Sequence, residues 1–110
     1  MEHIMHIKPE EALKTLEQTH LPFAEMFKHG SLSVEIYRPV GQDLQQPHTR
    51  DEVYVVLSGH GMFNNDGVIH PFAAGDFIFV PAGIEHRFET FSADFATWVM
   101  FYGSEGGERD

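Results

Sequence analysis

Apolar and polar residues alternate along most of this chain, in runs that are too short for helices. The clearest run covers 31–39, where Leu32, Val34 and Ile36 share one face of an extended strand. Similar short runs follow at a spacing of about ten residues, separated by turn sequences such as the Asn-Asn-Asp-Gly of 64–67. About eight short strands in this arrangement predict an all-β sandwich or barrel.

The first thirty residues follow a different pattern. Pro9 is followed by two acidic residues and by Ala12, Leu13 and Leu16 on one side, which predicts a short helix or helical turn. Residues 23–28 fit either a turn or an edge strand. We therefore expect three segments: an N-terminal arm over 1–30, a barrel over 31–102 and a flexible, glycine-rich tail over 103–110.

Composition narrows the possible partners. The chain has no cysteine, which excludes disulfides and thiolate-bound zinc. Its formal net charge of -10 comes from acidic residues spread along the whole sequence, so nucleic acid and anionic membranes are disfavoured. No apolar run approaches the roughly 20 residues that a membrane-spanning helix needs, and no secretory leader pattern opens the sequence. We expect a cytoplasmic protein with a small-molecule partner.

Two blocks of the sequence carry residues suited to chemistry. In the first block, three residues separate a histidine from a glutamate, and six more separate that glutamate from a glycine. In the second block, glycine, proline, glycine and histidine follow at fixed intervals that fit a strand, a turn and the start of another strand. The seven residues are His48, Glu52, Gly59, Gly75, Pro81, Gly83 and His86.

These spacings resemble the two signature motifs of the cupin family, and the resemblance covers about residues 32–102. It implies a double-stranded β-helix, or jelly-roll, barrel with a short helical or strand-like N-terminal arm. The sequence departs from the family pattern at three places. Gln46 stands where the family has its first histidine, Thr90 stands where it has a closing asparagine, and Gly41 lies one residue too close to the motif.

The resemblance implies that His48, Glu52 and His86 bind a divalent metal inside the barrel. Two histidines and one carboxylate are typical of non-haem Fe(II) sites, so Fe(II) is favoured over Mn, Ni, Zn or Co. Gln46 has the same strand parity as His48 and is a fourth candidate, either as a weak oxygen ligand or as a hydrogen-bond partner of metal-bound water. The alternative is that the fold has lost its metal and that these are ordinary polar residues.

Two residues are candidates for catalysis. Glu52 could exchange between metal ligand and general base. Tyr54 shares its parity on the predicted strand and would face the same interior. Simple core packing is the alternative for Tyr54.

The resulting hypothesis is a metal-dependent enzyme acting on a small molecule, of the dioxygenase or C–C cleaving type. Two alternatives stay open. One is a non-catalytic module that binds a sugar or metabolite, and the other is a metal-dependent isomerase or lyase. Members of the family commonly form dimers, and we expect a homodimer in which the apolar residues of the arm contribute contacts; they are Ile4, Ile7, Leu13, Leu16, Phe23 and Phe27.

Overall fold

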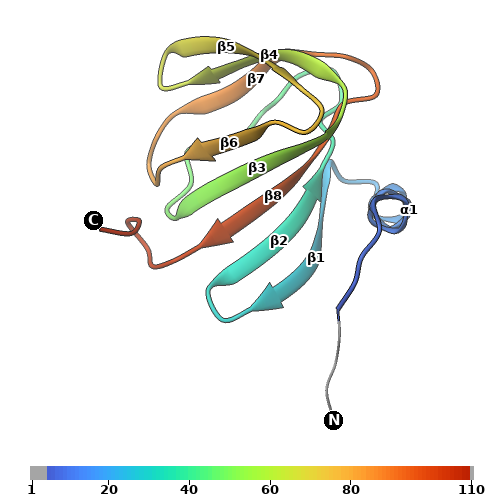
Figure 1. Ribbon diagram of the computed structural model, residues 1–110, viewed down its shortest axis with the longest axis horizontal. Helices are drawn as coiled ribbons and strands as arrows, with labels where there is room; N and C mark the ends of the chain where they lie inside the picture. Colours follow the sequence, from blue (N-terminus) through green and yellow to red (C-terminus); the bar gives the residue numbers. More distant parts are fainter. Residues whose placement is uncertain (1–4, 110) are drawn as a thin grey trace.

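The computed structural model describes residues 5–109 and contains two antiparallel sheets (Figure 1). The larger sheet has five strands in the order β1-β2-β8-β3-β6, and the smaller has three in the order β5-β4-β7. The strands are β1 (Phe23–His29), β2 (Leu32–Tyr37), β3 (Asp51–Ser58), β4 (His60–Asn65), β5 (Val68–Ala73), β6 (Phe77–Val80), β7 (His86–Phe91) and β8 (Ala96–Tyr102). The prediction of an all-β fold with about eight short strands is confirmed.

An aromatic core joins the two sheets. Tyr54 of the larger sheet packs edge-on against Phe63 and Phe88 of the smaller one, with ring centroids 5.7 and 4.9 Å apart. Phe72 and Phe95 extend the same buried cluster toward the other end of the barrel. Edge-to-face contacts of this kind add to the stabilisation that burial of the rings already gives.

A single helix, α1 (Pro9–Thr19), covers the outer face of the larger sheet (Figure 1). Its buried residues Ala12 and Leu16 pack against Ala24 of β1 and Ile36 of β2. Pro9 presets the first turn, where two glutamates complement the helix dipole. Among residues 5–109, no helix is long and apolar enough to cross a membrane.

Strand β2 contributes side chains to both faces of the larger sheet, one packed against α1 and one facing the barrel interior. Its even-numbered residues include Ile36 in the cluster beneath α1, whereas Tyr37 on the other face belongs to the barrel core. Because side chains alternate along a strand, Ser33 and Glu35 lie on the same inward face as Tyr37. The inner face of β2 is therefore its more polar face.

The arm and the tail are both attached to the barrel. Residues 23–29 form the edge strand β1, paired with β2, so the edge-strand alternative is confirmed for this segment. The N–H of Gly106 donates to the carbonyl of Thr49 at 2.6 Å, and the N–H of Glu108 donates to Oδ2 of Asp51 at 2.8 Å. Flexibility of the tail stays a prediction; these two bonds attach it to the segment that begins β3.

Homodimer formation stays a prediction, because the structure contains one chain. Of the arm residues assigned to that role, Leu16 is buried beneath the chain's own sheet, and Ile7 and Leu13 pack against the same cluster. Phe23 is 43% exposed, and Ile4 lies outside the described residues.

Candidate metal centre

Three side chains that are distant in sequence converge inside the barrel. Glu52 comes from β3, His86 from the start of β7, and His48 from the loop before β3. One ligand atom from each lies within 4.8 Å of the others. Nε2 of His86 is 2.7 Å from Oε1 of Glu52, and Nε2 of His48 is 4.0 Å from the same oxygen. The side chains of Glu52 and His86 are fully buried, whereas that of His48 is 34% exposed, so His48 connects the cluster to the surface.

Strand alternation places Glu52. In β3, Glu52, Tyr54 and Val56 are buried on the inner face, and the residues between them are only partly buried. Glu52 pairs with Val80 of β6 on one side and Phe101 of β8 on the other, so it sits in the middle of the larger sheet. A carboxylate in this position has little freedom to move.

The turn before β7 links the two sequence blocks. Gly83 has a φ of +78°, a conformation that glycine adopts without strain, and its N–H donates to the carbonyl of His48 at 2.7 Å. Oδ1 of Asp51 accepts the N–H of Ala82 at 2.9 Å, and this bond, together with the one from Glu108, holds the pKa of Asp51 below its usual value. Backbone bonds therefore tie the position of His86 to that of His48.

The hydrogen bonds of His86 determine which of its nitrogens faces Glu52. Nδ1 lies 2.9 Å from the carbonyl oxygen of Ile84, which can only accept, so Nδ1 carries the hydrogen. In the neutral ring Nε2 then presents a lone pair to Oε1 of Glu52. Among the described residues, neither Nε2 of His86 nor either oxygen of Glu52 has a hydrogen-bond partner.

This arrangement fits a bound cation. While His86 is neutral, the buried carboxylate has no hydrogen bond and two lone pairs face each other, which is costly. Either a proton on Nε2 of His86 or a bound cation removes this cost. Ligands of one transition-metal ion lie at about 2.0–2.2 Å from it, which puts them about 3–4 Å from one another. The separations of 2.7 and 4.0 Å measured here are close to that range. The three residues could therefore hold a divalent metal ion with small movements.

Burial and the charge of Glu52 together shift the pKa values of the two histidines in opposite directions. Burial lowers the pKa of His86, but contact with the Glu52 carboxylate outweighs burial, so the pKa of His86 is raised. For His48 burial dominates, and its pKa is lowered despite the attraction of Glu52. In the metal-free protein, His86 therefore takes up a proton at higher pH than His48 does.

Metal affinity is expected to fall as the pH decreases through about 6.5, because the ion must displace the proton that His86 holds. The raised pKa of His86 means that this competition begins above the ordinary imidazole value. Calorimetric titration of Zn²⁺ at about pH 7.5 and about pH 5.5, in buffers of different ionisation enthalpy, would measure both the affinity and the proton release. Equal affinity at both pH values would contradict this assignment of ligands.

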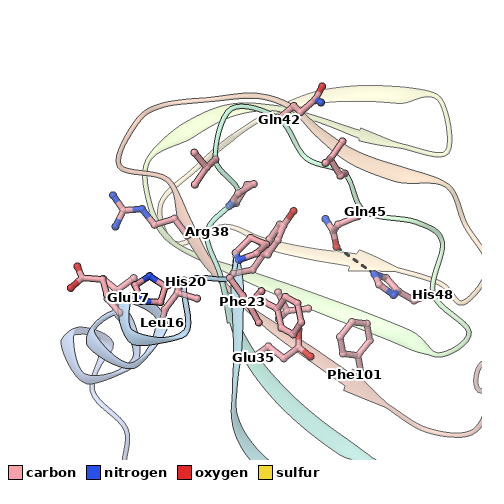
Figure 2. A pocket seen from close by; sticks show the side chains of 18 residues that line it. Leu16, Glu17, His20, Phe23, Glu35, Arg38, Gln42, Gln45, His48 and Phe101 are labelled. Carbon is pink, nitrogen blue, oxygen red and sulfur yellow. Dashed lines mark hydrogen bonds between the residues drawn. The ribbon is translucent and has the colours of Figure 1, made fainter.

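The expectation that Gln46 shares a face with His48 is wrong. Residues 43–48 form a loop and not a strand, so the two-residue periodicity does not apply, and Gln46 is exposed. The neighbouring Gln45 takes the position beside the cluster. Its Oε1 accepts the hydroxyl of Tyr54 at 2.9 Å and lies 3.4 Å from Nε2 of His48 (Figure 2).

Asp43 holds this loop in place, and sequence reasoning missed it. Its buried carboxylate accepts the hydroxyl of Tyr37 at 2.5 Å and the N–H of Phe88 at 2.9 Å. It also accepts the backbone N–H and the side-chain amide of Gln45, at 3.1 and 2.8 Å. An aspartate two residues after a glycine resembles an ordinary turn residue, so the sequence carries no signal for this role.

Tyr54 is fully buried between the sheets, with its hydroxyl directed at Gln45. Burial raises its pKa well above the usual value, and the negative charge of Glu52 raises it further. The hydroxyl therefore stays protonated and donates to Gln45. A catalytic role for Tyr54 stays a prediction, and its observed contact is with the loop that carries His48.

An open cleft of about 1050 Å³ reaches the metal centre at His48, its partly exposed residue (Figure 2). Its lining comes from the second half of α1 and the residues up to Phe23, from inward-facing residues of β2 and β8, and from the loop that contains Asp43. His48 and Gln45 form part of its wall. Apolar side chains dominate the remainder and include Leu21, Phe23, Leu44, Val99 and Phe101.

Comparison with known proteins agrees with this geometry. Residues 33–102 match the family model of the cupin domain. The chain is 33% identical to the uncharacterized protein SCO3923 of Streptomyces coelicolor over 81 residues, which is 72% of this chain and 77% of the relative.

Solved structures share the fold. The crystal structure of protein NMB1881 from Neisseria meningitidis has a TM-score of 0.70 at 17% identity, covering 90% of this chain and all of that one. An RmlC-like cupin from Shewanella frigidimarina has a TM-score of 0.61 at 22% identity, covering 74% and 75%. These matches confirm the jelly-roll prediction, and the chain belongs to the cupin family.

Proposed function

We propose that this protein is a metal-dependent enzyme that acts on a small molecule, of the dioxygenase or C–C cleaving type. One observation carries the proposal. Two histidines and one glutamate converge beside an apolar cleft whose wall includes His48, and three of their buried polar atoms have no hydrogen-bond partner among residues 5–109. Two histidines with one carboxylate are the ligand set of non-haem Fe(II) oxygenases, in which open coordination positions receive substrate and O₂.

In this proposal His48, Glu52 and His86 hold the ion, which would supply Lewis acidity and a place for substrate oxygens. The surrounding residues orient and shield the site. Gln45 is fixed from both sides by Asp43 and Tyr54, so its amide presents a constant polar contact at the mouth of the centre. The apolar cleft wall would exclude water from a bound substrate.

The test is anaerobic purification followed by metal analysis and oxygen-electrode measurements. We expect about one iron per chain, and O₂ consumption when a diketone or a phenol is added. Bound metal without O₂ consumption, together with turnover of a sugar or keto acid, would favour the isomerase or lyase alternative. Protein that binds a sugar without metal would favour the non-catalytic module.

Glu52→Gln is expected to abolish metal binding without reducing the stability of the metal-free protein. Glutamine keeps the size of the side chain and removes a buried charge. At a pH above the raised pKa of His86 that ring is neutral, so the substitution leaves no buried charge unpaired. Urea unfolding and metal titration of the same sample would separate the two effects.

Glu89→Gln is the matched control, because Glu89 is exposed on β7 and away from the centre. It is expected to change neither the metal affinity nor the stability of the protein in urea. A Glu52→Gln variant that keeps the wild-type metal affinity would exclude Glu52 as a ligand.

A further inference from the structure

We propose that Glu35 selects substrates that carry a cationic amine, which its carboxylate would bind inside the cleft while another part of the substrate reaches the metal centre. The inference rests on the proposed function and specifies its substrate class. It predicts that the cleft discriminates against carboxylates and other anions.

Glu35 belongs to the same cleft as the metal centre. It lies on the inward face of β2, and its register partner on β8 is Val99, which also lines the cleft. In Figure 2, Glu35 lies beside Phe101, whose ring packs edge-on against His48 at a centroid distance of 4.9 Å. A ligand that touches His48 would therefore have Glu35 and an aromatic ring within its reach.

No positive group in the part of the chain that the structure describes pairs with Glu35. Among residues 5–109 it has neither an ion-pair partner nor a hydrogen-bond partner. Its register partner on β1 is another acid, Glu25, whose carboxylate accepts the hydroxyl of Ser33. Burial raises the pKa of Glu35, and the charges of Glu25 and Glu52 raise it further. A half-buried carboxylate in these surroundings is stabilised by a cation and by hydrogen-bond donors.

The basic residues of the cleft lie at its other end. Figure 2 places Arg38 and His20 near the end of α1, away from His48. Arg38 already donates to the carbonyl of Ala93 at 3.4 Å. Neither residue is positioned to pair with a carboxylate beside Phe101. Arg50 lies over the ring of Phe101, with its guanidinium carbon 5.9 Å from the ring centroid, but it is not among the residues that line the cleft, and it donates to the carbonyl of Ser31.

Three probes that share a phenylethyl group test this: 2-phenylethylamine, 2-phenylethanol and 3-phenylpropanoate. All three carry the same phenyl group, which fits the apolar wall, and they differ in the charge of the end group. Their affinities would be measured by NMR titration of the metal-free protein, in which no metal ion can ligate the carboxylate or the amine. We expect the amine to bind at least about tenfold more tightly than the carboxylate, which corresponds to about 1.4 kcal/mol.

Glu35→Gln is expected to weaken binding of the amine by about tenfold and to leave the affinity for the alcohol unchanged. The exposed-residue control Glu89→Gln is expected to leave all three affinities unchanged. Should Glu35→Gln not fold, Glu35→Ala takes its place, because the wild-type order alone does not separate the effect of Glu35 from that of the overall net charge of -10.

Equal affinities, a preference for the carboxylate, or no measurable binding of any probe would overturn the proposal. An amine preference that survives in Glu35→Gln would overturn it as well. The metal content of Glu35→Gln is expected to equal that of the wild type, so a failure of this inference leaves the metal centre intact. Loss of metal binding in the wild-type protein with an intact amine preference would instead contradict the proposed function alone.

Discussion

Replacing His86 with alanine is expected to lower the affinity for divalent metal at least tenfold, equivalent to about 1.4 kcal/mol. Nε2 of His86 is the ligand atom nearest to Glu52, at 2.7 Å, and the bond from Nδ1 to Ile84 fixes its direction. Without this ring, the ion would keep one imidazole, which is partly exposed, and one carboxylate. Competition of the purified variants against a chromogenic chelator would measure the change in affinity.

Two further variants make this result specific. His86→Gln keeps a side chain in the space, so it separates the loss of a ligand from the opening of a cavity. His70→Ala removes an exposed histidine on β5 and is expected to bind metal as the wild type does. Metal affinity that is the same in His86→Ala and His70→Ala would exclude the assigned site.

Asp43→Ala is expected to lower the free energy of unfolding by about 3 kcal/mol. The substitution leaves the hydroxyl of Tyr37 and the N–H of Phe88 without their acceptor in a buried region. It also releases the side chain of Gln45, so metal affinity is expected to fall because His48 loses a fixed neighbour. Urea unfolding monitored by the fluorescence of Trp98 would measure the stability.

The control for Asp43 is again an exposed acid, and Glu89→Ala is expected to change stability by no more than about 0.5 kcal/mol. Asp43→Asn retains one acceptor oxygen and is expected to fall between the alanine variant and the wild type. If the urea concentration at the unfolding midpoint is the same for Asp43→Ala and the wild type, the buried carboxylate does not hold the loop in the way the structure indicates.

The strands and the residues on them were predictable because alternation and turn residues are local signals. The parity of Glu52, Tyr54 and Val56 on β3 is visible in the sequence, and all three are buried on one face. The motif spacing identified the two histidines and the glutamate that the structure brings together. Part of that spacing is Gly83, which the turn before β7 requires because its φ of +78° is a conformation that few other residues adopt without strain.

The loop and the cleft were not predictable in the same way. The parity rule assigned Gln46 to the site, but it holds only within a strand, and the loop instead places Gln45 there. The role of Asp43 depends on partners six and forty-five residues away, Tyr37 and Phe88. The inward direction of Glu35 became clear only once α1 was seen to cover the opposite, apolar face of β2.

X-ray diffraction from crystals of metal-loaded protein, with anomalous differences recorded on both sides of the metal's absorption edge, tests the central claim most directly. The account predicts one ion per chain inside the barrel, at about 2.1 Å from Nε2 of His48, Nε2 of His86 and a carboxylate oxygen of Glu52. An ion bound only by other residues, or no anomalous peak within reach of these three side chains, would contradict it.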